Sequence, residues 1–227
     1  MASEVDICNM ALSRLGDQAT VSSIDPPEGS PQAGHCAQWY PICRDLLLEM
    51  HTWSFATTRV ALALLNSDWP SWRFTYAAPA DCIKPWAVLP PDALNDYAVR
   101  FPTADVGFFP LPEDRVVGAG AAYVPQDFSV ESADDGTTVI YTNQKNAILR
   151  YTKQVTDPTK FTPLFVDAFG WLLASYLAGP IIKGDAGAQA AQTAYQAFQG
   201  ALSRATTSNA NSRQNTPVQV VPWMARR

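Results

Sequence analysis

The sequence predicts an α+β fold: a helical bundle formed by the N- and C-terminal helices, with an inserted β-rich domain and an extended C-terminal tail. Three observations predict it. Apolar residues near both ends recur at three- and four-residue steps, as in amphipathic helices. Nine prolines between residues 69 and 125 exclude long helices from the middle. The chain after residue 205 is polar and aperiodic. We therefore divide the chain into an N-terminal helical part, a β-rich insertion, a C-terminal helical hairpin and a tail: 1–66, 67–156, 157–205 and 206–227.

The first helix is expected directly after Ser3. The Ser3 side chain can cap its N-terminus, and Glu4 and Asp6 stand in the first turn, where negative charge is favourable. Gly16 suits the position that follows the helix, because glycine adopts positive φ at little cost. The apolar stripe at helical spacing comprises Val5, Cys8, Leu12 and Leu15.

A second helix is expected from about Gln32 to Met50. Pro41 stands inside this pattern, and we expect it to kink or interrupt the helix. The apolar segment 59–65 is compatible with a short helix or a strand, because its periodicity does not decide between them.

Short strands are expected in the proline-rich middle. The clearest signal is a hairpin of 128–131 and 137–142, with Asp135-Gly136 in the turn. Segment 148–155 alternates in the same way, and we expect it to add a third strand to this meander. The other expected strands are 73–76, 83–89, 97–101 and 115–123.

The C-terminal third is expected to form an antiparallel helical hairpin. Segment 164–183 is apolar almost all round, as in a helix buried on every side. Its uncharged stretch, 168–182, is too short to span a bilayer comfortably, so we expect a core helix and no membrane contact. The second helix, 186–204, has an expected packing face of Ala190, Ala194, Ala197, Phe198 and Leu202.

The composition limits the function classes. Only 16% of the 227 residues are charged, against roughly 25% in an average soluble domain. The net charge of −5 argues against a protein that wraps nucleic acid electrostatically. With 47% hydrophobic residues the chain is not disordered. The charge deficit indicates surface that is buried against partners.

The sequence offers few groups for catalysis, and we expect no cofactor. A metal site of His35, Cys36 and Cys43 was weighed against plain buried thiols, which the absence of a CxxC pair favours. Asp45 and Glu49 have the spacing of a carboxylate pair, but a solvated acidic face is the simpler interpretation. The aromatic clusters carry few basic neighbours, which favours core and interface packing over base stacking.

The end of the chain is the candidate binding segment. A polar stretch is followed by an apolar, Trp-bearing terminus, which is typical of a segment that docks on another subunit or protein. Ordinary disorder and docking on its own subunit are the alternatives. The predicted partner-binding residues are Val220, Val221, Trp223, Met224, Arg226 and Arg227.

Four motifs follow one another along the chain. The first is 7–16 (ICNMALSRLG), and the second is 43–59 (CRDLLLEMHTWSFATTR). The third is 72–82 (WRFTYAAPADC), and the fourth is 151–155 (YTKQV), which leads into the C-terminal helices. In this order they resemble the head-to-tail adaptor proteins of short-tailed bacteriophages, the tail tubular protein A type, whose opening is I-x-N-x-A-L-x-x-L-G. The resemblance covers most of residues 5–205 and leaves out the tail.

The resemblance implies a structural, non-enzymatic virion protein of the phage neck, assembled in the host cytoplasm. It implies a homo-oligomeric ring, of twelve copies in this family, that binds the portal protein on one side and the tail nozzle protein on the other. Double-stranded DNA would pass through the lumen without specific binding, and we expect the lumen to be net negative. The alternatives are another head-completion or tail-terminator ring protein, or an enzyme such as a cysteine hydrolase that uses Cys36 or Cys43.

Overall fold

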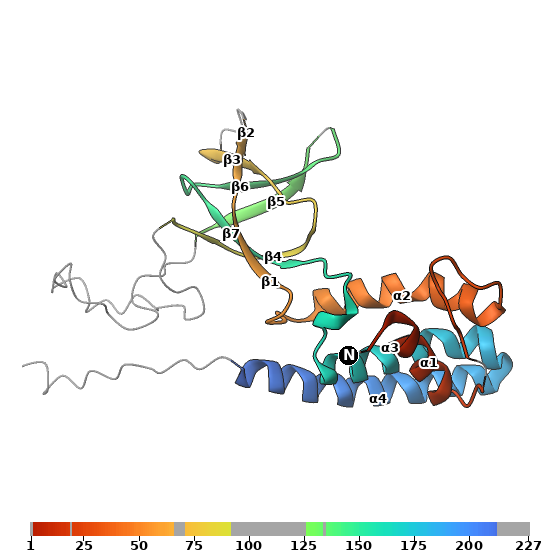
Figure 1. The fold of residues 1–227 in the computed structure, drawn as a ribbon. Helices are drawn as coiled ribbons and strands as arrows, with labels where there is room; N and C mark the ends of the chain where they lie inside the picture. The colour runs from red at the N-terminus through yellow and green to blue at the C-terminus, as the bar shows by residue number, and fades with distance from the viewer. Residues whose placement is uncertain (1, 19, 66–70, 92–125, 134, 213–227) are drawn as a thin grey trace, which may run out of the picture. The chain divides into compact units, whose positions relative to one another are not determined.

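The computed structural model describes residues 2–18, 20–65, 71–91, 126–133 and 135–212. It confirms the α+β class, with four α-helices and antiparallel sheet (Figure 1). The expected strands 97–101 and 115–123, and the end of the expected tail, lie outside the described residues.

The chain divides into two compact units. The helical unit comprises Met1–Thr57 and Thr152–Arg213, and the β unit comprises Thr58–Tyr151. The first boundary lies nine residues before the expected one at 66/67, because the ambiguous segment 59–65 falls in strands: β1 is Thr57–Ala61 and β2 is Ala63–Leu65.

Helix α1, Glu4–Arg14, begins as the sequence predicts. The Asp6 amide donates to the Ser3 hydroxyl at 3.1 Å, and the Ser3 amide donates to the Asp6 carboxylate at 2.9 Å. This capping box satisfies two backbone donors that no helical carbonyl can reach. Gly16 follows the helix with φ of 78°, in the left-handed region expected of it.

Helix α2, Pro31–Met50, starts at a Ser30 cap. Pro41 lies inside it and does not interrupt it. Tyr40 and Cys43, on either side of the proline, are both buried in the helical unit. Tertiary packing on both sides of Pro41 therefore outweighs its intrinsic cost.

Helices α3, Pro163–Ile182, and α4, Gly184–Asn211, form the expected antiparallel pair, preceded by a 3₁₀ turn at Pro158–Lys160. Lys183 alone separates them, with φ of 60°. The expectation of a tail from residue 206 is wrong for its first part, because α4 continues to Asn211. Ala205 and Asn209 are buried on the packed side of the helix, which extends it beyond the point where composition alone indicates its end.

Helix α3 is the centre of the helical unit. It packs against α1, α2 and α4, and nine of its residues are buried. Among the described helices it is the one long and apolar enough by composition to cross a membrane, and half of its most apolar window is buried inside the protein. Its apolarity is thus accounted for by packing on three sides.

The β unit contains two sheets. The three-stranded sheet has the order β1-β7-β4, with β4 at Cys82–Leu89 and β7 at Ile148–Lys153. The antiparallel four-stranded sheet has the order β2-β3-β6-β5. Its remaining strands are β3 at Phe74–Ala77, β5 at Phe128–Ser132 and β6 at Thr138–Thr142.

The predicted hairpin of β5 and β6 is confirmed, with Gly136 at φ of 81° in its turn. The prediction that β7 extends this meander is wrong. Strand β6 has β3 on one side and β5 on the other, so no edge of it is left for β7. Strand β7 instead lies between β1 and β4 in the other sheet.

A small core joins the faces of the two sheets. Leu62, Phe74 and Phe128 pack against it as partly buried neighbours. The buried members are Tyr76, Val88, Ile140, Ala147, Leu149 and Tyr151.

Candidate functional site

The six partner-binding residues predicted at the C-terminus lie outside the described residues. The described surface nearest to them in sequence is α4. Of its 28 residues only Asp185 and Arg204 are charged. We name its exposed side the α4 outer face, and it comprises Gln189, Gln192, Thr193, Tyr195, Gln196, Gln199, Gly200 and Ser203.

The packed side of α4 agrees in part with the predicted face. Ala194 and Phe198 are buried, whereas Ala190, Ala197 and Leu202 are half-buried. Gly187 is also buried, and a Cβ placed on it would lie 3.1 Å from the backbone oxygen of Ala178. The start of α4 therefore approaches the α3 backbone as closely as glycine permits.

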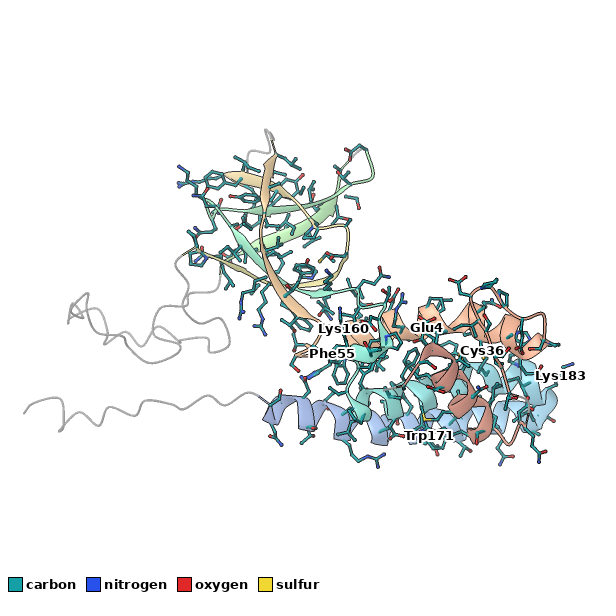
Figure 2. The ribbon with its side chains drawn as sticks, in the orientation of Figure 1. Glu4, Cys36, Phe55, Lys160, Trp171 and Lys183 are labelled. Atoms are coloured by element: carbon teal, nitrogen blue, oxygen red, sulfur yellow. The ribbon has the colours of Figure 1, made fainter. Side chains whose placement is uncertain are left out.

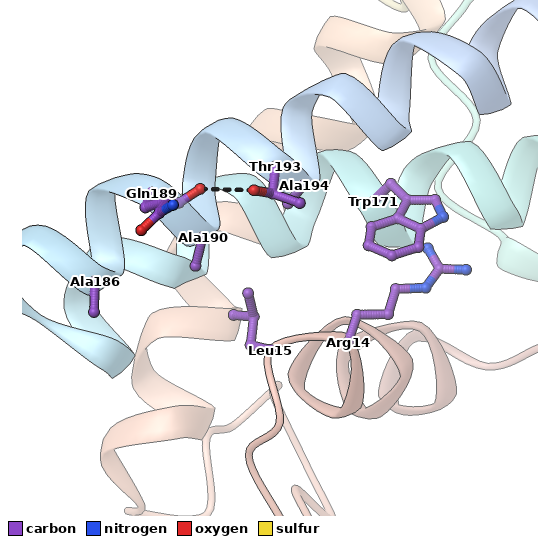
Figure 3. A pocket seen from close by; sticks show the side chains of 8 residues that line it. All are labelled: Arg14, Leu15, Trp171, Ala186, Gln189, Ala190, Thr193 and Ala194. Atoms are coloured by element: carbon purple, nitrogen blue, oxygen red, sulfur yellow. Dashed lines mark hydrogen bonds between the residues drawn. The ribbon is translucent and has the colours of Figure 1, made fainter.

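A groove of about 410 Å³ runs beside α4 where α1 ends (Figure 3). Arg14 and Leu15 form one wall, and Trp171 of α3 forms the floor at one end. The α4 wall consists of Ala186, Gln189, Ala190, Thr193 and Ala194. It is an apolar groove with one arginine and one tryptophan, the residue types that most often dominate binding between proteins.

Arg14 is held in this groove by three interactions. Its guanidinium lies over the Trp171 ring at 4.3 Å from the centroid. It also donates to the Asp167 backbone oxygen at 2.8 Å and to the Asp167 carboxylate at 2.5 Å. Arg204 of α4 reaches the second oxygen of that carboxylate at 3.3 Å. Three helices thus meet at Asp167, and the guanidinium is fixed before any partner arrives.

Gly170 makes this arrangement sterically possible. A Cβ at residue 170 would lie 2.7 Å from the end of the Met10 side chain and 2.8 Å from an Arg14 nitrogen. The sequence does not predict this cluster, because Arg14 has the pattern of an ordinary basic residue in the last turn of a helix. Its partners lie more than 150 residues away, and no local pattern marks them.

The cysteines of the helical unit are interior thiols, as expected. Cys8, Cys36 and Cys43 are fully buried and not in disulfides (Figure 2). A hydrogen bond with Cys36, together with burial, raises the pKa of Cys8. Burial raises the pKa of Cys43 to about 12. A nucleophile must reach its substrate, and with no exposed surface Cys36 and Cys43 cannot do so in this conformation.

The sequence offered two sets of polar groups for chemistry: His35, Cys36 and Cys43 as metal ligands, and Asp45 with Glu49 for acid–base work. Among the described residues, no group of three or more His, Cys, Asp or Glu side chains is placed to hold a metal ion. Asp45 accepts from the Arg44 Nε at 2.8 Å and from the Gln154 amide at 2.8 Å. One oxygen of Asp45 is thus paired within α2, and the other connects α2 to the segment after β7.

The described aromatic residues of the helical unit pack against one another. Phe165 is fully buried, 5.0 Å from the ring centroids of both Trp53 and Phe55 and 4.8 Å from that of Phe161. Phe55 and Lys160 mark this end of the unit in Figure 2. These rings are used in the core, in agreement with the packing interpretation.

Residues of the four motifs hold the fold together. Asn9 pins the loop after α1, because its amide donates to the Val21 oxygen at 2.9 Å and accepts from the Val21 amide at 2.7 Å. The buried Trp53 indole donates to the Leu47 oxygen at 2.8 Å. In the β unit the Tyr151 hydroxyl donates to Asp81 at 2.9 Å.

One polar residue outside the motifs closes the helical unit. Asn209 near the end of α4 accepts from the Ser54 amide at 2.9 Å and donates to the Thr52 oxygen at 2.9 Å. Its amide nitrogen also lies 3.0 Å from the His51 Nε2. The end of α4 is therefore tied to the loop that follows α2.

Comparison of the chain with models of known protein families and with curated protein sequences found no match.

Proposed function

We propose that this chain is the subunit of a head-to-tail adaptor ring of a tailed phage. In this role it stands between the portal protein and the tail nozzle protein in the virion neck. Double-stranded DNA passes through the ring, and the chain acts as a structural part and not as an enzyme. The ring of the resembled family has twelve copies, and we propose the same number here.

The observation that carries the proposal is the α4 outer face. A 28-residue helix is roughly 42 Å long, and on a freely solvated protein its exposed side would carry many charges. Here the exposed side carries two charges, Asp185 and Arg204, and the α4 outer face itself is neutral, with small residues, glutamines and Tyr195, which is 46% exposed. Depletion of charge at the centre of a surface is typical of a subunit interface.

The groove beside α4 supports the same role. Arg14 and Trp171 are pre-positioned there, so a partner that binds them has little side-chain entropy to lose. In a ring, one surface of each subunit binds a different surface of the next subunit, and the rotation between neighbours must bring the last subunit back to the first. The α4 outer face and the groove share Gln189 and Thr193, so they form one continuous surface that supplies one half of such a contact.

The charge balance fits a conduit for DNA. Each chain has 21 acidic and 16 basic residues, so a ring of identical copies carries a net negative charge that multiplies with the number of copies. We propose that the lumen is net negative, so that the genome slides through. A lumen dominated by Lys and Arg in an image of the assembled ring would contradict this.

The tail residues Val220, Val221, Trp223, Met224, Arg226 and Arg227 are proposed to contact the portal or a neighbouring subunit. A truncation after Arg204 would be a poor test, because it would also remove Asn209 and with it the bonds to Thr52 and Ser54. A truncation after Ser212 leaves all of α4 in place. It should lower the affinity for portal-bearing heads at least tenfold, as measured by co-sedimentation, without lowering the helical circular dichroism signal.

Electron microscopy of the chain, alone and mixed with portal-bearing heads, tests the function directly. The informative variant is Gln192→Glu with Gln199→Glu, which adds two charges to the α4 outer face at almost unchanged shape. The matched control is Gln38→Glu at an exposed position of α2. We expect rings below the portal for the parent and the control, and none for the double variant, because buried unpaired charge is costly.

The outcomes separate the alternatives. Rings of another symmetry, or rings bound away from the portal, would indicate another head-completion or tail-terminator protein. No ring in any condition would overturn the proposal. Rings of the double variant would leave the adaptor role in place but remove the α4 outer face from its interface.

A further inference from the structure

The β unit has an open seam between its two sheets. Strand β4 is an edge of the three-stranded sheet, and β5 is an edge of the four-stranded sheet. They meet at one end, where Val88 and Gln126 form an isolated bridge. At the other end, near Cys82 and Val130, a hollow of about 430 Å³ separates them.

The hollow has a mostly apolar lining, with Thr137 and Thr138 as its polar side chains. Eleven residues line it, and none of them is charged. Those that matter for the argument are Pro79, Cys82, Ile83, Pro85, Val130 and Ile140. A pocket of this size has room for one or two large apolar side chains, and its lining loses no charge–water contacts when it is filled.

The core of the β unit runs directly into this hollow. Ile140 pairs with Tyr76 on one side and with Val130 on the other, so the three side chains share one face of the sheet. Tyr76 and Ile140 are buried, whereas Val130 is 40% exposed. Val130 therefore belongs to the core by position and is only partly covered by the described residues.

The edge beside Val130 can also take a strand. Among the described strands β5 pairs with β6 alone, so the backbone groups on its outer side have no ladder partner in the described sheets. An extended segment that adds there gains backbone hydrogen bonds and places alternate side chains over the hollow.

The chain supplies a segment of matching chemistry at its end. Residues 218–224 read VQVVPWM, with three valines of high β propensity and one tryptophan; Pro222 directly before the tryptophan has no N–H to donate, which an edge position tolerates. Two arginines, Arg226 and Arg227, follow it. Asp81 and Glu131 flank lining residues in sequence, and so does Lys84, so two of these three flanking charges are opposite in sign to the arginines.

The length of the tail is sufficient for a contact between subunits. Trp223 stands eleven residues after Ser212, and a fully extended chain of that length reaches roughly 36–40 Å. A tail of one copy that fills the β unit of the next is a head-to-tail contact, the kind that generates a closed ring.

We propose that residues 218–224 of one copy add along β5 of a neighbouring copy and place Trp223 in the hollow between β4 and β5. This inference rests on the proposed ring and names the surface that receives the tail. In this arrangement Trp223 of one subunit covers the row of paired side chains Tyr76, Ile140 and Val130 on the sheet of the next subunit.

Photo-cross-linking of the full chain tests this. Trp223 is replaced by p-benzoylphenylalanine, and the variant is mixed with ¹⁵N-labelled parent chain under ring-forming conditions. After irradiation, mass spectrometry locates the cross-link and shows whether it joins two isotopes. We expect cross-links from residue 223 to residues 77–85 or 130–140, and we expect them to join labelled with unlabelled chains.

Two matched variants make the test specific. Val130→Glu places a charge at the mouth of the hollow and should lower the cross-link yield about tenfold or more. Val60→Glu makes the same change at a valine of β1 that is 37% exposed and outside the hollow, and it should leave the yield unchanged. Retained circular dichroism of both variants shows that they fold.

Three results would overturn the inference: cross-links to any other surface, cross-links confined to chains of one isotope, or equal yields from the two glutamate variants. Occupancy of the hollow by residues 92–125 of the same chain would give the first of these. Rings on the portal together with cross-links elsewhere would refute this inference and leave the proposed function standing. Cross-links in the hollow without portal binding would support this inference and contradict the proposed function.

Discussion

The helical unit and the β unit bury their cores to different degrees. In the helical unit, α3 is packed on three sides, and Phe165 lies fully buried among four aromatic rings. In the β unit, six buried residues form the core, and Val130 at its border remains 40% exposed. The comparison teaches that the described residues of the helical unit cover their own core, whereas those of the β unit leave Val130, at the border of its core, partly exposed.

The largest expected effect comes from emptying the aromatic core. Phe165→Ala should lower the free energy of unfolding of the helical unit by about 3–5 kcal/mol, because the cavity cannot be refilled by neighbouring rings. Val130→Ala in the β unit should cost less than about 1 kcal/mol in the isolated chain. Denaturant unfolding followed by circular dichroism measures both. Similar losses would contradict the contrast between the two units.

The next effect concerns the tie between α4 and the loop after α2. Asn209→Ala should cost about 2 kcal/mol, since it leaves the Ser54 amide and the Thr52 oxygen without these partners. Asn209→Asp retains an acceptor for Ser54 and loses both donated bonds. Chemical denaturation should therefore place the aspartate variant below the parent as well. Parent-like stability of both variants would show that this tie is dispensable.

Removal of a buried tyrosine hydroxyl should change the free energy of unfolding in opposite directions in the two units. The Tyr76 hydroxyl in the β unit donates to the Gln144 oxygen at 2.9 Å, so Tyr76→Phe should cost about 1 kcal/mol. The Tyr40 hydroxyl in the helical unit is buried and has no hydrogen-bond partner among the described residues. Tyr40→Phe should leave stability unchanged or raise it by up to about 1 kcal/mol. Thermal melts of the two variants give the comparison, and two losses of equal size would refute it.

The smallest effect separates two glycines of α4. Gly200→Ala meets open space and should stabilise the helical unit by about 0.5–1 kcal/mol through helix propensity. Gly187→Ala meets the Ala178 backbone oxygen at 3.1 Å, and the strain should cancel or reverse that gain. Differential scanning calorimetry resolves the shift in Tm. A Gly187→Ala protein as stable as Gly200→Ala would show that the two helices can move apart freely.

Local signals in the sequence were sufficient for most of the described elements. The Ser3 cap, the Asp135-Gly136 turn and the apolar run of α3 each depend on residues close together in the sequence. A single stretch of sequence is therefore enough to predict each of these elements. The register of segment 59–65 depends instead on strands that follow it in the chain. The periodicity of this segment could therefore not decide between helix and strand.

The errors have long-range causes. Strand β7 was misplaced because the occupation of both edges of β6 is a property of the sheet and not of residues 148–153. The end of α4 was placed too early because Asn209 is polar, and its partners lie near residue 52. The groove of Arg14 and Trp171 was missed for the same reason. The hollow beside Val130 could be found only once both sheets were known.

The adjacency of β1 and β7 has a consequence for the order of folding. Helices α2 and α3 pack together, but the β unit, residues 58–151, separates them in the chain. Closing a flexible loop of that length carries a large entropy cost. Because β1 and β7 are neighbours in one sheet, and the Lys153 amide donates to the Ala56 oxygen at 2.8 Å, a folded β unit brings the ends of this loop together. We therefore expect the β unit to fold first. The contacts between α2 and α3 are then no longer separated by a flexible loop, so the helical unit should fold as fast as a protein whose contacts are local in sequence.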